Sequence, residues 1–170
     1  MKAQLVVLLL GALCLPSLAQ NLPPSCGPEK QAVDVRTAKN HHPTIPLAPG
    51  TATLVFIQRS PVCIGCGEVR IGVDGSWVGA NKGDSYFSVS VAPGERHVCA
   101  YWSSTFSVLE DKLWLTDVSA RMAQTYYYYA DFFGNTARGG LTLRLEPISP
   151  DEANFLISNS SLASSTPGKP

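Results

Sequence analysis

The sequence predicts an all-β protein, an antiparallel β-sandwich with an N-terminal arm and a short C-terminal helix. Over residues 51–148, short apolar or alternating stretches are separated by turns that contain glycine and proline. The region before them is rich in turn residues, and a helix-capping pattern follows them near residue 149. We therefore divide the chain into an export signal (1–19), an arm with a short strand (20–50), the sandwich (51–148), a helix (149–158) and a tail (159–170).

Residues 1–19 have the pattern of an export signal. Lys2 is their only charge, and the apolar run Leu5–Leu15 is shorter than the roughly 20 residues that a membrane span needs. Pro16 ends that run, and Ser17-Leu18-Ala19 supplies the small residues that a signal peptidase requires. We predict cleavage after Ala19, which removes Cys14 and places the protein in a secreted or periplasmic location.

The composition excludes two classes of partner. The 170 residues carry 13 basic and 13 acidic side chains, so loss of Lys2 leaves 12 against 13 and a formal charge of −1. Such a balance gives no basic surface for nucleic acid or anionic membrane. After the signal, no stretch of the sequence is long and apolar enough to span a membrane.

The sandwich strands are predicted from apolar runs and from alternation with a period of two. Thr51–Arg59 is apolar and β-branched, typical of a buried strand, and Val69, Ile71 and Val73 alternate with polar residues. Asp74-Gly75 is a two-residue hairpin signal. This spacing favours a sandwich of the immunoglobulin or transthyretin type. Further strands are expected around 33–35 in the arm and at 76–80, 84–91, 96–103, 112–119, 125–133 and 140–146.

The C-terminal part is expected to contain one helix and a disordered tail. Ser149–Glu152 forms a capping box with Pro150 at the first helical position. Ala153 and Leu156 belong to an apolar side, so the helix should pack across one sheet or its edge. From Ser158 onward the chain is rich in serine, proline and glycine, which predicts disorder.

The cysteines predict two disulfides. Cys26, Cys63, Cys66 and Cys99 remain after cleavage, and an even number in an exported chain is typical of a disulfide framework. Three pairings are possible. We favour Cys63–Cys66 at a loop tip and Cys26–Cys99 between the arm and a strand, although pairing of Cys99 with Cys63 or Cys66 stays open.

A series of motifs resembles a known family. Pro49–Val55 reads P-G-T-A-T-L-V, and Ile71–Gly79 reads I-G-V-D-G-S-W-V-G. Tyr86–Val98 fits Y-F-x-x-x-V-x-P-G-E-x-x-V, and Thr125–Tyr128 reads T-Y-Y-Y before the closing L-x-L-x-L of Leu141–Leu145. In this order the motifs resemble the bacterial secreted family catalogued as domain of unknown function 2846. The D-G hairpin and the P-G-E turn are shared with small β-sandwich domains of the PEGA type.

The resemblance covers Pro49 to Glu146 and implies a β-sandwich outside the cytoplasm. The arm around Ser25-Cys26-Gly27-Pro28 and the S-P-D-E-A-N-F-L-I end are similar to a longer subgroup of secreted bacterial proteins. The family implies no activity, so no catalytic residue is carried over to this chain.

The cysteine loop is expected to be structural. Cys63-Ile64-Gly65-Cys66 has redox spacing, but a thioredoxin-type site needs its first cysteine at a helix N-terminus, and a strand is predicted from Glu68. The alternative is a zinc site formed by Cys63, Cys66, His97 and Cys99. Since zinc would compete there with oxidation to disulfides, we expect no metal and no cofactor.

Other catalytic arrangements are not favoured. His41 and His42 are adjacent, so their side chains point apart in an extended arm. Asp117 and Asp131 are a formal carboxylate pair for glycoside hydrolysis, but single acids on sheets are more often solvated. The sequence contains no nucleophile-elbow, metalloprotease or phosphate-loop motif.

The aromatic residues suggest a binding surface. Tyr126–Tyr129 alternate along one strand, so one pair of rings should enter the core with Ala130 and the other pair should face outward. Exposed flat rings suit sugars or peptides. Packing in the core or beneath the C-terminal helix is the competing interpretation. The candidate surface consists of Trp77, Trp102, Trp114, Tyr127 and Tyr129.

These patterns favour a non-catalytic binding or structural module of the bacterial envelope, with an envelope protein or a glycan as partner. The alternative function is a small thiol- or zinc-dependent protein that uses the Cys63/Cys66 loop. A purely structural domain without a ligand is the third interpretation.

Overall fold

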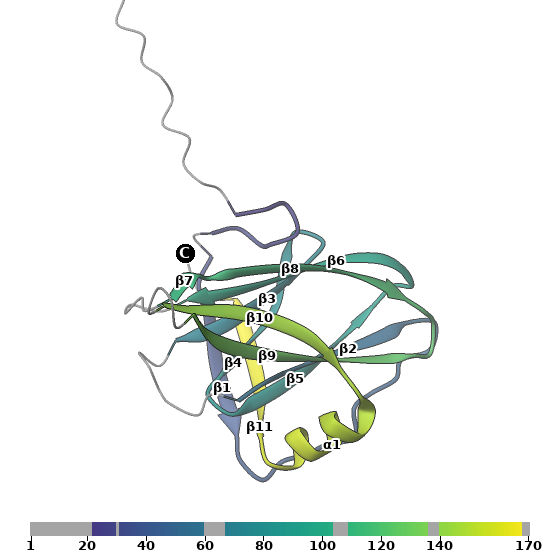
Figure 1. Ribbon diagram of the computed structural model, residues 1–170. Helices are drawn as coiled ribbons and strands as arrows, with labels where there is room; N and C mark the ends of the chain where they lie inside the picture. Colours follow the sequence, from purple (N-terminus) through teal and green to yellow (C-terminus); the bar gives the residue numbers. More distant parts are fainter. Residues whose placement is uncertain (1–21, 30, 60–66, 104–108, 136–139, 168–170) are drawn as a thin grey trace, which may run out of the picture.

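The part of the chain that the structure describes folds into two β-sheets that pack face to face, with one helix at the periphery (Figure 1). The computed structural model describes residues 22–29, 31–59, 67–103, 109–135 and 140–167. Cys63 and Cys66, and the predicted signal with its cleavage site, lie outside these residues. None of the described helices is long and apolar enough to cross a membrane.

Within the described ranges, the larger sheet has seven strands, and we call it the seven-stranded sheet. In spatial order these strands are β1 (Val33–Ala38), β11 (Ser161–Pro167), β5 (Ser85–Val91), β2 (Ala52–Gln58), β9 (Thr125–Asn135), β10 (Gly140–Ile148) and β7 (Leu109–Asp111).

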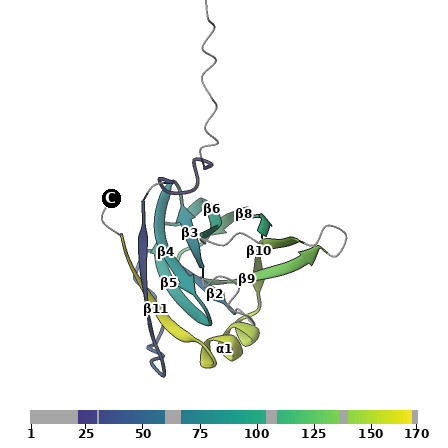
Figure 2. The same ribbon diagram turned by 90° about the vertical axis from the view of Figure 1, so that its left-hand side faces the viewer.

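The smaller sheet has four strands in the same described ranges, and we call it the four-stranded sheet. Its strands follow one another across Figure 2. They are β4 (Ser76–Lys82), β3 (Glu68–Val73), β6 (Gly94–Ser103) and β8 (Leu113–Ala120).

The all-β prediction is confirmed, but the sheets are not wholly antiparallel. In the seven-stranded sheet, β2 pairs with β9, β5 with β11 and β7 with β10 in parallel. Between β2 and β9 the chain forms all of the four-stranded sheet and also β5 and β7, and parallel neighbours need such a long connection. The four-stranded sheet is antiparallel throughout its described pairings.

The main core fills the space between the sheets. Val69 and Ile71 of β3 face Leu54 and Phe56 of β2 across it, and all four side chains are fully buried. Tyr128 also enters this core from β9, where burial raises the pKa of its phenol to about 12. The alternation read from the sequence therefore places these strands correctly, with one face of each toward the core.

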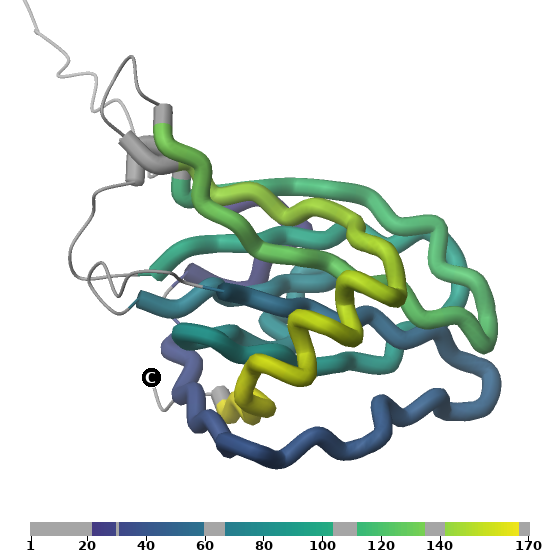
Figure 3. Tube along the Cα trace, turned by 60° about the horizontal axis from the view of Figure 1, so that its bottom comes forward, coloured from purple at the N-terminus to yellow at the C-terminus, as the bar shows by residue number. Residues whose placement is uncertain are grey.

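A second apolar cluster lies on the other face of the seven-stranded sheet, beneath α1 (Pro150–Ser158). Figure 3 shows the helix, in yellow, lying across this sheet. Ala153 and Leu156 supply its buried side, and the side chain of Ser149 accepts a hydrogen bond from the backbone N–H of Glu152 at 3.2 Å. The structure has the predicted helix, with Ser149 as its N-cap.

The tail predicted to be disordered instead forms strand β11 over Ser161–Pro167. It pairs antiparallel with β1 from Ala38↔Leu162 to Val33↔Pro167. Ala163 enters the main core and Leu162 packs against the second cluster, so alternate side chains bury on both faces of the sheet. The serine-rich composition led to a prediction of disorder. That prediction is wrong because strands far away in the sequence bury these two side chains.

Candidate binding groove beside the disulfide-anchored arm

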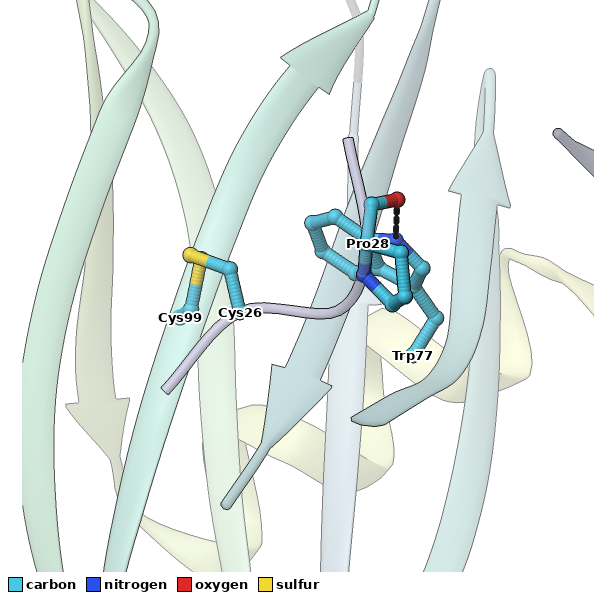
Figure 4. The surroundings of a disulfide bond; sticks show 4 residues. All are labelled: Cys26, Pro28, Trp77 and Cys99. Atoms are coloured by element: carbon cyan, nitrogen blue, oxygen red, sulfur yellow. Dashed lines mark hydrogen bonds between the residues drawn. A yellow bond between two sulfur atoms is a disulfide. The ribbon is translucent and has the colours of Figure 1, made fainter. Parts of the chain in front are cut away.

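The N-terminal arm crosses the outer face of the four-stranded sheet and is fixed there by a disulfide. Cys26 is bonded to Cys99 of β6, 73 residues further along the chain, with the two Cα atoms 5.2 Å apart (Figure 4). Both cysteines are buried. This Cys26–Cys99 pairing was one of the two favoured from the sequence, and the arm is therefore part of the folded body.

Glycines let the arm lie directly on the backbone of the sheet. A Cβ on Gly72 would meet the Cα of Cys26 at 2.9 Å and the carbonyl oxygen of Ser25 at 3.0 Å. Gly75 has a φ of +87°, and a Cβ there would lie 2.9 Å from the carbonyl oxygen of Pro24. Asp74 also has a positive φ, which fits the predicted Asp-Gly hairpin. Any side chain at Gly72 would push the arm away.

Further along, the arm is held by hydrogen bonds from β3 and β4. The indole Nε1 of Trp77 donates to the carbonyl oxygen of Pro28 at 2.9 Å (Figure 4). Arg70 Nη1 donates to the carbonyl oxygen of Gln31 at 3.0 Å, while its Nε pairs with Glu68 at 2.7 Å. These contacts tie two carbonyl groups of the arm to side chains of the sheet.

A cavity of about 590 Å³ lies between the arm and the β6–β8 pair, and we call it the groove. Its volume is in the range of small-ligand and peptide pockets. The arm forms one side with two consecutive prolines, and strands β6 and β8 and the β3–β4 turn form the rest. The lining residues are Pro23, Pro24, Ser25, Asp74, His97, Val98, Leu115, Thr116 and Asp117.

His97 is the centre of the polar part of the groove. Its Nδ1 lies 2.7 Å from Oδ1 of Asp117, the residue opposite it on β8. Its backbone N–H donates to Oδ1 of Asp74 at 2.9 Å, and Arg96 Nη1 donates to the other oxygen of Asp74 at 2.8 Å. One imidazole and two carboxylates are thus brought together by the pairing of β6 with β8 and by the β3–β4 turn.

These contacts shift two pKa values. The hydrogen bond to Asp117 raises the pKa of His97 above its usual 6.5, and the negative charges of Asp117, Asp74 and Glu95 act in the same direction. The pKa of Asp74 is lowered, first by the hydrogen bond from the backbone N–H of His97 and then by Arg96. Asp74 therefore stays ionised to lower pH than a free carboxyl group.

The groove combines this acidic character with apolar surface. Glu95 lies on β6, two residues before His97, and accepts a hydrogen bond from Ser119 on β8. Leu115 is 48% exposed, although it projects from a strand whose Val118 and Ala120 are buried. The three carboxylates of Glu95, Asp117 and Asp74 outnumber the two basic groups, Arg96 and His97, so the surface favours cations.

One of the predicted ligands of the alternative zinc site is not available to bind a metal. Cys99 is committed to the disulfide with Cys26, and His97 is paired with Asp117. Cys63 and Cys66, the other two members, lie outside the described residues. Among the residues that the structure describes, no cluster of three metal-ligating side chains occurs.

The five aromatic residues of the candidate surface do not lie together. Trp102 is 6% exposed in the main core, and Trp114 packs against that core with the Arg144 guanidinium 5.9 Å from its ring. Trp77 contacts the arm on the outer face of the four-stranded sheet. Tyr127 and Tyr129 pack in the cluster beneath α1. The competing interpretation, core and helix packing, therefore accounts for four of the five: Trp102, Trp114, Tyr127 and Tyr129.

The other sequence candidates are also separated. Asp117 lies on the four-stranded sheet and Asp131 on β9 of the other sheet, where Asp131 accepts a hydrogen bond from the backbone of Phe132. They do not form a carboxylate pair for glycoside hydrolysis. His42 stacks on Tyr86, with ring centroids 6.1 Å apart, while both arm histidines stay exposed to solvent.

Sequence reasoning missed the groove because its parts come from three distant segments. His97 and Asp117 were considered separately, as a zinc ligand and as a hydrolase carboxylate. The available signal was Gly72, since an isolated glycine in a strand marks a bulge or the close approach of another backbone. Here it marks both, because the β3–β4 register shifts beside Gly72 and the arm lies over it.

The fold and the groove define an all-β protein with a disulfide-anchored arm. Comparisons of the chain with family models, curated proteins and solved structures find no match. The family resemblance drawn from the motifs stays a prediction.

Proposed function

We propose that the protein is a non-catalytic binding module that acts outside the cytoplasm and takes a segment of a partner protein into the groove. The observation that carries this proposal is the disulfide-anchored arm, which holds Pro23 and Pro24 opposite Leu115 in the free protein. A rigid wall lowers the conformational cost of binding.

The chemistry of the groove favours a peptide over a glycan. Sugar sites rely on flat aromatic rings, and among the described lining residues the only aromatic ring is the imidazole of His97. Prolines and an exposed leucine supply apolar contact, while carboxylates and backbone groups supply hydrogen-bond partners. Peptide segments carry side chains for apolar contact as well as for hydrogen bonds.

The hydrogen-bond partners of His97 also fit a binding role better than a catalytic one. Its imidazole is oriented by Asp117, as in a general base, but in the part of the chain that the structure describes no serine or cysteine side chain bonds to the ring. Ser119 on the same face is bonded to Glu95 instead.

The test is selection of peptides from a random displayed library on the oxidised protein. We expect enriched peptides whose binding is lost in Leu115→Asp, which places a charge in the apolar part of the groove. The matched control is Phe155→Asp, because Phe155 is 64% exposed on α1, outside the groove lining. Enriched peptides that bind Leu115→Asp as tightly as the wild type, or no enrichment at all, would refute the proposal.

A further inference from the structure

Strand β8 forms one edge of the four-stranded sheet, and its hydrogen-bonding pattern fixes which backbone groups face outward. β6 and β8 are antiparallel with a continuous register from Gly94↔Ala120 to Tyr101↔Leu113. The next pair, Trp102 and Lys112, is hydrogen-bonded, since the N–H of Trp102 donates to the carbonyl of Lys112 at 2.8 Å.

Hydrogen-bonded and non-hydrogen-bonded pairs alternate along an antiparallel ladder. Trp114, Thr116 and Val118 therefore direct their backbone groups toward β6. Leu115 and Asp117 direct their N–H and C=O groups away from the sheet. Among the described residues, no backbone hydrogen bond outside the strand ladders is made by either of them.

Among the described residues, the stretch of β8 with unpaired outward backbone groups ends near Ser119. The next outward-facing residue is Ser119, and its carbonyl already accepts a hydrogen bond from the hydroxyl of Tyr126 at 3.0 Å. That hydroxyl also accepts one from the backbone N–H of Arg121. Of the β8 residues whose backbone groups face outward, Leu115 and Asp117 are the two that line the groove.

Strand β4 forms the opposite edge of the same sheet, and backbone groups there already have hydrogen-bond partners. On β4, the backbone N–H of Ala80 donates to the side chain of Ser165 on β11 at 2.9 Å, and the Ala80 carbonyl accepts from the same hydroxyl. Strand β1 is also an edge, but the cavity beside it measures only about 70 Å³. Of these edges, β8 is the one that borders the groove.

Resting on the function proposed above, we propose that an extended segment of the partner adds to the four-stranded sheet along β8, placing an apolar side chain on Leu115 and a lysine or arginine against Asp117. Addition of a strand satisfies the outward N–H and C=O groups, as in other cases of recognition at a sheet edge.

The spacing of the two side-chain contacts follows from the strand geometry. Leu115 and Asp117 lie two residues apart on one face, so the partner must present its apolar and cationic residues two apart as well. Opposite charges in directly facing positions stabilise a strand pair, and Glu95 on the neighbouring strand adds to the negative potential. An acidic segment of the same shape is disfavoured by repulsion.

The probe for the test is a short peptide that repeats valine, threonine, lysine and threonine, so that valine and lysine lie two residues apart on one face, and its matched control has glutamate in place of lysine. We expect the lysine peptide to bind the oxidised, isotope-labelled protein and to slow hydrogen exchange at the backbone amides of Leu115 and Asp117. The amides of Thr116 and Val118, which already bond to β6, serve as internal references. The glutamate peptide should protect neither Leu115 nor Asp117.

A second measurement uses proline at the edge. Leu115→Pro removes one outward N–H without removing a bond to β6, and proline is tolerated at such edge positions. Leu115→Ala is the control for the lost side chain. We expect Leu115→Pro to bind the lysine peptide roughly tenfold more weakly than Leu115→Ala does, since an unmade hydrogen bond is left in the complex.

The outcomes separate this inference from the proposed function. Shifts at groove residues with unprotected Leu115 and Asp117 amides would overturn strand addition and leave the groove as a binding site. Protection of both amides in the free protein that grows with its concentration would mean that a second copy occupies β8, which overturns a partner segment. Absence of any binding by the lysine peptide would overturn the inference, while the library selection tests the groove independently.

Discussion

Removal of the Cys26–Cys99 disulfide should destabilise the protein strongly. The bond closes a loop of 73 residues. In the chain-entropy model, a cross-link over such a loop stabilises the folded state by about 4 kcal/mol near room temperature. For a chain of this size, that loss corresponds to a decrease of roughly 10 °C in Tm. The double variant Cys26→Ala/Cys99→Ala tests this loss of stability without introducing free thiols at these positions.

The assay is urea unfolding of the oxidised wild type and the double variant, with the free energies extrapolated linearly to water. The control is Cys63→Ala/Cys66→Ala, since those cysteines are so close in the sequence that their predicted disulfide should contribute less than about 2 kcal/mol. A loss below about 1 kcal/mol in Cys26→Ala/Cys99→Ala would refute the conclusion that the disulfide fixes the arm to the sheet.

Three further variants test separate parts of the structure. Gly72→Ala should lower the free energy of unfolding by about 1–3 kcal/mol, because its Cβ meets the Cα of Cys26; thermal unfolding identical to wild type would contradict this. Gln58→Met should raise it by about 1 kcal/mol, because neither buried amide atom of Gln58 has a partner among the described residues; a loss of stability would be the contrary result. Asp117→Asn should lower the pKa of His97, measured by NMR titration, and an unchanged pKa would show that the contact is absent in solution. Because folding raises the pKa of His97, the stabilisation it gives is complete below the unfolded-state pKa, and the difference in stability between wild type and Asp117→Asn should vanish as pH rises through the folded-state pKa.

The local features of the fold were predictable because short-range chemistry determines them. The Asp74-Gly75 hairpin follows from the positive φ that both residues adopt, and the helix start follows from the capping side chain of Ser149. The core face of β3 follows from the spacing of Val69 and Ile71, which lie two residues apart and therefore on the same face. In each case the information lies within a few residues.

The features that were missed depend on contacts between distant segments. The parallel pairing of β2 with β9 requires the whole four-stranded sheet to lie between them in the sequence. Strand β11 is ordered by β1 and β5, since its own composition favours disorder. The groove requires the arm to reach Cys99, so its lining residues share no sequence signal, and the pointer in the sequence is Gly72, over which the arm lies.

Mapping the bound peptide most directly tests the central claim that the arm and the β6–β8 pair form the binding site. The measurement is the change in backbone amide chemical shifts of the oxidised protein on titration with a peptide selected from the library. The account predicts that the shifts cluster at Ser25, His97, Leu115 and Asp117 and disappear in Leu115→Asp. Shifts that cluster instead on α1, around Phe155, would contradict it.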